Sequence, residues 1–218
     1  MIKAVIFDMD GLMFDTEHLL YEAWDYAGEK LGIGKAGIMA IETLGISNAD
    51  SRYMWYDRYG DAYDEGKIKE YTYEFIEKYF TEKGIPKKKG LDELLAYLAE
   101  KGYRTAVATS SSKRSLMRNL TAAGLENRFD VLVNCNMVSM SKPFPDVYLK
   151  AMELLGLTAD ECLVLEDSIN GIKAASAAGC RAIMIPDLVQ PTEEIEKLLF
   201  KKCGSLDEVI AVLEQLNK

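Results

Sequence analysis

The chain has 218 residues, of which 49% are hydrophobic and 28% are charged, and a formal net charge of −9 at pH 7. This composition is typical of a globular protein with one large domain, or with one domain that carries a modest insertion. The acidic charge disfavours a long polyanion such as nucleic acid as a partner, although it does not exclude a small phosphate ester.

The first predicted element is a strand over residues 2–8, and it runs directly into acidic residues. The apolar run AVIF is followed by Asp8, Asp10 and Asp15. Burying an unpaired carboxylate is costly, so two interpretations are open. Either the strand ends at Phe7 and the acids are solvated, or the acids end a buried strand at a site for a metal and a phosphate.

Residues 16–83 have a helical pattern and contain no convincing strand. About ninety residues separate the first two predicted strands, which is far more than a βαβ step needs. We therefore expect an inserted all-helical domain at residues 16–83, with residues 1–15 and 84–218 forming the main domain. The lysine run Lys87–Lys89 is most simply a solvated loop on the return into the main domain.

Four further apolar strands follow, and they alternate with helical patterns that end at glycine. Strands with near-continuous apolar character, separated by helices, indicate a parallel sheet covered on both faces. The predicted fold class is therefore α/β, with a doubly wound, mainly parallel, Rossmann-like sheet and the inserted helical domain. The four strands are predicted over residues 103–109, 129–134, 161–167 and 180–186.

Polar residues follow four of the predicted strands, at the edge where open parallel sheets bind ligands. Mg²⁺ prefers one or two carboxylates together with waters and phosphate oxygens, so a magnesium and phosphate site is expected there. Asp8 and Asp167 are the predicted carboxylate ligands, and Glu166 is either a further ligand or a supporting contact. In chain order the polar residues are Asp8 and Asp10, then Thr109, Ser110 and Ser111, then Lys142, then Glu166 and Asp167.

Four segments in this order resemble the four motifs of the haloacid dehalogenase superfamily. They are DMDGLMFDT, the TSS that follows an apolar strand, SKPFPD and LEDSINGI. The similarity covers almost the whole chain and is greatest with the β-phosphoglucomutase-like phosphatases, which carry a helical cap after the first motif. The resemblance implies a Mg²⁺-dependent phosphatase that hydrolyses small phosphate monoesters, sugar phosphates among them.

The resemblance also implies a role for individual residues. Asp8 would be the nucleophile and would form an aspartyl-phosphate. Asp10 would act as general acid and then as general base, and its backbone carbonyl would bind the metal together with Asp8 and Asp167. Lys142 would hold Asp8 and offset the charge of the transferring phosphoryl group.

Other residues near the motifs have structural alternatives. Thr109 and Ser110 would bind the substrate phosphate, which is the favoured interpretation; the alternative is a strand-end hydroxyl at Thr109 and a helix cap at Ser110–Ser112. Asp146 is expected to act as the N-terminal charge of the following helix rather than as a ligand. Asp15 is expected to order the connection into the insertion, and His18, the single histidine, to be exposed and inert.

Two rival functions remain open beside the phosphatase. In related mutases a histidine near the start of the cap and a basic residue further on support the catalytic cycle, whereas Leu20 and the segment LGISN, with Leu44 and Asn48, stand at the matching places here. A phospho-aspartate signalling module would also use strand-end acids, a hydroxyl and a lysine. A general base at Asp10 speeds hydrolysis of an acyl-phosphate and so disfavours such a switch. The dehalogenase branch lacks the second aspartate.

The remaining expectations concern location and partners. The apolar stretches are too short to cross a bilayer, and the chain starts with a strand pattern rather than a signal peptide. The four cysteines have no spacing typical of zinc or of a disulfide framework, which indicates reduced thiols in a cytoplasmic protein. We expect a monomer that binds a small phosphorylated metabolite, with neither nucleic acid nor a membrane as a partner.

Overall fold

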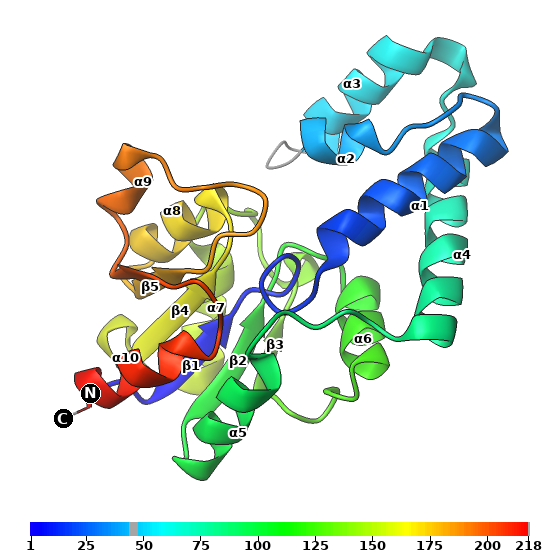
Figure 1. Cartoon of the computed structure of the whole chain (residues 1–218). Coiled ribbons are helices and arrows are strands. Elements are labelled where there is room, and N and C mark those ends of the chain that lie inside the picture. Colours follow the sequence, from blue (N-terminus) through cyan, green and yellow to red (C-terminus); the bar gives the residue numbers. More distant parts are fainter. Residues whose placement is uncertain (44–47, 218) are drawn as a thin grey trace. The chain divides into compact units, whose positions relative to one another are not determined.

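The computed structural model describes residues 1–43 and 48–217, apart from the side chains of residues 48 and 49. The chain forms two compact units (Figure 1). One consists of Met1–Phe14 and Pro86–Lys218, and the other is Asp15–Ile85. The boundaries expected from the sequence, after residue 15 and before residue 84, lie next to these limits.

A six-stranded sheet forms the centre of the first unit, in the order β3-β2-β1-β4-β5-β6. Every neighbouring pair is parallel, so the sheet is wholly rather than mainly parallel. The α/β fold class and the five predicted strands are confirmed. The sequence prediction missed β6, because this short edge strand consists of two exposed lysines and has no apolar pattern. The strands are β1 (Ala4–Phe7), β2 (Arg104–Ala108), β3 (Val131–Val133), β4 (Cys162–Glu166), β5 (Arg181–Met184) and β6 (Lys201–Lys202).

Helices cover both faces of the sheet (Figure 1). The helices α7 and α8 pack against the strands on one face, while α5 packs against β2 and α10 on the other. The helices of this unit are α5 (Leu91–Glu100), α6 (Lys113–Ala122), α7 (Asp146–Leu155), α8 (Ile169–Ala177), α9 (Glu193–Glu196) and α10 (Glu208–Leu216), with the 3-10 helices η2 (Cys135–Met137) and η3 (Ala159–Glu161).

The double covering explains why the central strands carry apolar residues at successive positions rather than only at alternate ones. Successive side chains of a strand point to opposite faces, so a sheet covered on one face would need apolar residues only at alternate positions. All four residues of β1 are fully buried. Ala4 and Ile6 belong to the cluster that includes Tyr148 of α7 and Ile172 of α8. Burial of a side chain such as Ile6 contributes about 1.5–3 kcal/mol to stability.

The second unit contains helices and no strand among its described residues. The long helices α1 and α4 pack along each other. A second cluster surrounds Trp55, whose ring lies 5.0 Å from that of Trp24. Asp64 caps the N-terminus of α4, and its carboxylate accepts a hydrogen bond from the amide of Lys67. The elements are α1 (Thr16–Leu31), α2 (Ile38–Glu42), α3 (Asn48–Tyr59), the 3-10 helix η1 (Gly60–Ala62) and α4 (Glu65–Lys83).

The segment that carries Lys87–Lys89 is not a freely solvated loop. The Lys88 amide donates to the carbonyl of Met13, and the Lys88 ammonium pairs with Asp187 at 2.6 Å. Lys87 and Lys89 are exposed, as predicted, but the prediction was wrong for Lys88. Its partners lie far away in the sequence, so the local pattern of charges could not show them.

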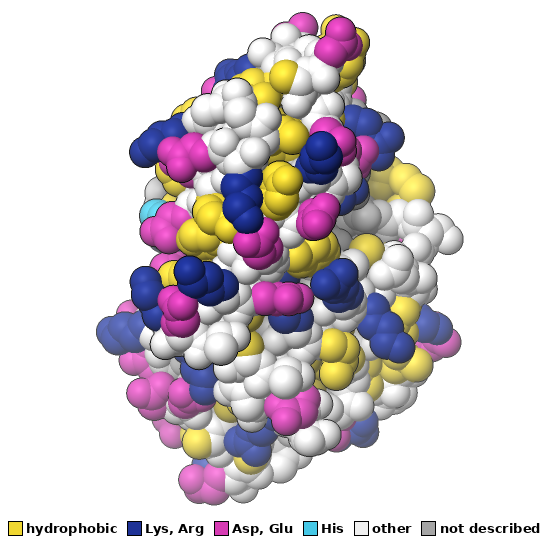
Figure 2. Space-filling model, turned by 90° about the vertical axis from the view of Figure 1, so that its right-hand side faces the viewer, with side chains coloured by type: hydrophobic (Ala, Val, Ile, Leu, Met, Phe, Trp, Pro, Cys, Tyr) yellow, Lys and Arg dark blue, Asp and Glu magenta, His cyan; other side chains and the backbone are white. Residues whose placement is uncertain are grey.

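Charges of both signs are mixed on the face of the molecule seen in Figure 2, where Lys and Arg side chains lie among Asp and Glu side chains. Such a face lacks the concentrated positive potential that a phosphate backbone would need. Among the described helices, none is long and apolar enough to cross a membrane.

Candidate active site

The strand order places the end of β1 beside the ends of β2 and β4. Asp8 follows β1, and its amide donates to the carbonyl of Leu165 in β4. The chain builds outward from β1 through β2 to β3, and later from β4 through β5 to β6, so β1 and β4 flank the point where the order reverses. Open α/β sheets bind ligands at the carboxyl edge of such a switch point.

Three acids at this edge are buried. Their burial decides whether the acid directly after the first strand is solvated or belongs to a buried site. Asp8 is 7% exposed, Asp167 is 5% exposed and Glu166 is fully buried. Carboxylate oxygens of these three residues lie within 4.8 Å of one another. The interpretation of Asp8 as a solvated strand-end acid is therefore wrong.

A single lysine contacts two of the three acids. The Lys142 Nζ pairs with Asp8 Oδ1 and lies 2.6 Å from Glu166 Oε1. It also donates to the backbone carbonyl of Ala108 at 3.1 Å. Three buried carboxylates so close together repel one another, and a divalent cation with oxygen ligands would offset this repulsion together with Lys142.

The ionisation of these groups follows from their burial and their neighbours. Burial raises the pKa of Asp8 to about 7, with Lys142 opposing the rise and Glu166 adding to it. Burial also acts to raise the pKa of Glu166, but Lys142 and the other hydrogen-bond donors hold that pKa below its ordinary value. Burial acts to lower the pKa of Lys142, yet the two acids together hold it above its ordinary value. Lys142 is therefore a permanent cation in this site.

Glu166 is held by hydrogen bonds on both oxygens. Its Oε1 accepts from Lys142 and from the hydroxyl of Tyr148, each at 2.6 Å. Its Oε2 accepts from the amides of Asp167 and Ser168 and from the Ser168 hydroxyl. With both oxygens engaged in this way, Glu166 is suited to orienting Lys142 and the residues that follow β4.

Two glycines allow the backbone to approach these carboxylates. Gly11 has φ of 85°, and a Cβ there would lie 2.3 Å from Asp167 Oδ2. In α8, a Cβ at Gly171 would lie 1.8 Å from the carboxyl carbon of Glu166. A larger residue at either position would displace an acid of the site.

The hydroxyl-rich segment after β2 divides into a buried and an exposed part. Thr109 is buried, and its Oγ1 accepts from the amide of Ser111 at 3.0 Å, which leaves its own proton free to be donated. Ser110 is exposed. Ser112 caps α6 by accepting from the amide of Ser115. The cap therefore lies at Ser112, and the arrangement of Thr109 is compatible with phosphate binding as well as with a structural role.

Asp10 is contacted from α6 and from the loop before it. The hydroxyl of Ser111 donates to Asp10 Oδ2 at 2.7 Å. The side-chain amide of Asn119, a residue in the middle of α6, lies 3.3 Å from Asp10 Oδ1. The carboxylate thus meets hydrogen-bond donors on both of its oxygens.

Comparison with known proteins gives this arrangement a family. Residues 5–185 match the family described as haloacid dehalogenase-like hydrolase. The chain belongs to this family. Its predicted membership of this superfamily, in the β-phosphoglucomutase-like phosphatase branch, is confirmed.

Individual relatives match nearly the whole length of this haloacid dehalogenase-like hydrolase. Protein CbbY (plasmid) of Cupriavidus necator is 33% identical over 231 residues, which cover 99% of this chain and 86% of that protein. Hexitol phosphatase B of Escherichia coli strain K12 is 32% identical, with 96% and 95% covered. A solved structure of a putative β-phosphoglucomutase from Thermotoga maritima is 26% identical with a TM-score of 0.82, and 98% and 99% are covered. The relatives support the predicted enzyme class, a phosphatase.

Tyr148 and Asn119 contact acids of the hydrolase site and were not predicted from the sequence. Tyr148 resembles any core aromatic residue, and nothing in its surroundings indicates that its hydroxyl reaches Glu166. The sequence pattern could have indicated Asn119, because this residue shares the buried face of α6 with Leu116 and Leu120. A polar residue at an apolar position of an amphipathic helix indicates a specific partner.

Each unit by itself shows the surroundings of other residues that were singled out in the sequence. Asp146 begins α7 and accepts from the amide of Met140, in agreement with a helix N-terminal role. His18 is exposed, as predicted, and Leu20 is partly buried in α1. Leu44 lies outside the described residues, as does the side chain of Asn48.

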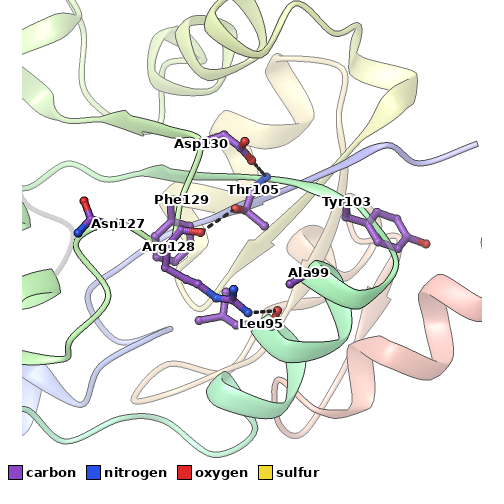
Figure 3. A pocket seen from close by; sticks show the side chains of 8 residues that line it. All are labelled: Leu95, Ala99, Tyr103, Thr105, Asn127, Arg128, Phe129 and Asp130. Carbon is purple, nitrogen blue, oxygen red and sulfur yellow. Dashed lines mark hydrogen bonds between the residues drawn. The ribbon is translucent and has the colours of Figure 1, made fainter.

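A separate cavity of about 180 Å³ lies at the opposite end of the sheet (Figure 3). It is lined by residues at the amino ends of β2 and β3. Several of its polar groups have partners within the chain. Arg128 donates to the carbonyl of Leu95 at 2.8 Å, and Asp130 accepts from the amide of Thr105 at 2.7 Å. This cavity is therefore a structural feature of the amino-end edge.

Replacing Lys142 by methionine should lower the free energy of unfolding by about 3–5 kcal/mol at pH 8, because it leaves buried carboxylates without their cation. Without Lys142 the pKa of each acid is higher in the folded than in the unfolded state. The decrease in the free energy of unfolding is therefore greatest at alkaline pH. It becomes smaller as the pH falls towards about 4, where the carboxyl groups of the unfolded chain are also protonated.

Urea unfolding at pH 8 and pH 5 measures this effect. The matched control is Lys150→Met, which removes a partly exposed lysine of α7 that pairs with Glu153. Its effect should stay within about 0.5 kcal/mol. An equally small change for Lys142→Met at pH 8 would show that the buried pair does not stabilise the fold.

Proposed function

We propose that this haloacid dehalogenase-like hydrolase is a Mg²⁺-dependent phosphatase that hydrolyses small phosphate monoesters through an aspartyl-phosphate on Asp8. The observation that carries the proposal is the buried cluster of Asp8, Glu166 and Asp167 around Lys142 at the switch point of the sheet. Such a cluster can bind an anion only if cations offset its own charge, and it presents a nucleophile beside them.

The donor set fits a hard divalent cation, since every candidate ligand is an oxygen. We assign the metal ligands to the carboxylates of Asp8 and Asp167 and to the backbone carbonyl of Asp10. Glu166 would support the site by orienting Lys142 and the loop after β4, because its oxygens already accept five hydrogen bonds. When bound, Mg²⁺ supplies Lewis-acid stabilisation of the transferring phosphoryl group.

The residues of the chain carry the two chemical steps. In the first, an oxygen of Asp8 forms a bond to phosphorus, the ester P–O bond breaks, and Asp10 gives a proton to the departing alkoxide. In the second, Asp10 takes a proton from water, the water oxygen bonds to phosphorus, and the bond between phosphorus and the Asp8 oxygen breaks, which frees inorganic phosphate and restores the Asp8 carboxylate. Lys142 offsets phosphoryl charge, and the Thr109 hydroxyl and the segment at Ser110 donate hydrogen bonds to phosphate oxygens.

The substrate class we propose is phosphorylated sugars or sugar alcohols. The similarity to a hexitol phosphatase and to a putative β-phosphoglucomutase supports this class. Residues 1–15 and 84–218 would form the catalytic core, and residues 16–83 would form a cap that recognises the leaving group. A monomeric state, a cytoplasmic location and the absence of a nucleic acid partner stay predictions.

A phosphosugar mutase is the second candidate, and the similarity to the putative β-phosphoglucomutase favours it. A mutase must protect the aspartyl-phosphate from water until a second sugar hydroxyl takes the phosphoryl group. Leu20 cannot move a proton, and the neutral Asn48 cannot offset the charge of a second phosphate, so these residue types argue for hydrolysis. A signalling module, the third candidate, has no support from the family match.

Purified protein should release inorganic phosphate from sugar monophosphates with Mg²⁺, and excess chelator should lower this turnover by at least about 100-fold. Adding Mg²⁺ back should restore it, which controls for damage by the chelator. With β-glucose 1-phosphate and a trace of the bisphosphate, phosphate and glucose 6-phosphate are followed together. Full activity in chelator would exclude the metal, and glucose 6-phosphate forming faster than phosphate would establish the mutase.

A further inference from the structure

The side chain of Asn119 occupies a position that normally belongs to an apolar residue. It is 1% exposed and lies in the middle of α6, on the same buried face as Leu116 and Leu120. Burying a side-chain amide is unfavourable unless its polar atoms are hydrogen-bonded. The contacts of Asn119 therefore show what this residue is placed to do.

The orientation of the Asn119 amide is determined by its neighbour in the sequence. The side-chain oxygen accepts from Nε and Nη2 of Arg118, at 3.1 Å and 3.0 Å. A guanidinium can only donate, so the atom facing it must be the oxygen. The amide nitrogen consequently faces Asp10 Oδ1 at 3.3 Å, and it lies 3.9 Å from the sulfur of Met9.

These contacts form a directed chain from Arg118 through Asn119 to Asp10. Ser111 donates to the other oxygen of Asp10, so the carboxylate is held from two sides. Two donors on different oxygens restrict rotation about the bond between Cβ and the carboxyl carbon. A group that transfers protons in two successive steps depends on such control, because a displacement of about 1 Å can cost 10²-fold in rate.

We propose that Asn119 is a positioning residue for Asp10, with Arg118 setting the direction of its amide. The inference rests on the proposed phosphatase function and adds a residue to it: Asn119 touches neither substrate nor metal and acts through Asp10. A purely structural role would be to satisfy a polar atom inside the core. Such a role predicts a change in stability with no selective change in the rate of proton transfer.

The test is Asn119→Leu, which keeps the size of the side chain and removes both hydrogen bonds. With a sugar phosphate and saturating Mg²⁺, kcat should fall about 10–100-fold and KM should stay within about twofold. In an Asp10→Asn background the same substitution should change kcat by less than about twofold, because the group it positions no longer transfers protons. The matched control is Asn127→Leu, at an exposed position of the amino-end edge, with unchanged kcat.

The outcomes separate this inference from the function on which it rests. An active wild type with unchanged kcat in Asn119→Leu would overturn the positioning role alone, as would an equal loss in the Asp10→Asn background. A wild type without phosphatase turnover would overturn the proposed function and the inference with it. If Asn119→Leu does not fold, Arg118→Met is used, and kcat should fall several-fold at unchanged KM; an unchanged kcat would overturn the inference.

Discussion

Asp8→Asn should abolish phosphatase turnover, with a loss of at least about 10⁴-fold in kcat, because removing a covalent nucleophile leaves only binding and electrostatic contributions. Asparagine has nearly the same shape as aspartate, so the buried site should keep its packing. Release of inorganic phosphate from a sugar phosphate measures the loss. The matched control is Asp92→Asn, an acid on the surface of α5 whose substitution should leave kcat unchanged.

The Asp8→Asn variant should be at least as stable as the wild type in metal-free buffer at pH 8. Burial raises the pKa of Asp8 to about 7 in the folded protein, above its ordinary value. An acid with a raised pKa destabilises the folded state as the pH rises from its unfolded pKa to its folded pKa, and asparagine cannot ionise. Thermal unfolding with and without Mg²⁺ measures this, and added Mg²⁺ should stabilise the wild type more than the variant.

Phosphate release and thermal unfolding of Asp8→Asn together distinguish a role in the reaction from a role in folding. Lost activity with an unchanged melting temperature would mean that Asp8 takes part in the reaction and is not needed for folding. Substantial remaining activity would mean that water attacks phosphorus directly, and the covalent route would have to be abandoned. Lost activity with a collapsed melting temperature at pH 8 would contradict the expected effect of burial on Asp8.

Asp10→Asn should lower kcat for a sugar phosphate by about 10²–10⁴-fold, the usual worth of a general acid–base group. The loss should be smaller for formation of the aspartyl-phosphate from p-nitrophenyl phosphate, because the nitrophenolate leaves readily without a proton. Hydrolysis of the intermediate still needs Asp10 as a base. The variant should therefore release one equivalent of nitrophenolate rapidly and then turn over slowly.

Rapid-mixing measurement of nitrophenolate tests this second expectation. The control is the double variant with Asp8→Asn, which should show no burst because it has no nucleophile. Equal losses for the sugar and aryl esters, without a burst, would mean that Asp10 does not serve as the proton donor and acceptor of the two steps.

The sequence alone was enough for the layered fold and for the edge of the sheet at which the acids gather. Strands buried on both faces must be apolar at every position, so β1 and β4 stand out from helices and loops without any tertiary information. Because parallel strands bring their carboxyl ends to one edge, the positions of Asp8, Lys142 and Asp167 along the chain already placed them on that edge. The edge strand β6 was not predicted, because its two exposed lysines form no apolar run.

The tertiary structure decided which polar groups meet and what each contact does to their charge. Asp8 could have been solvated, and only its packing between β4 and the Lys142 loop shows it to be buried. The pairing of Tyr148 with Glu166 and of Asn119 with Asp10 joins segments 18 and 109 residues apart. Composition and periodicity report burial along one element, whereas hydrogen bonds of a few ångströms depend on how different elements pack, so no local pattern contains them.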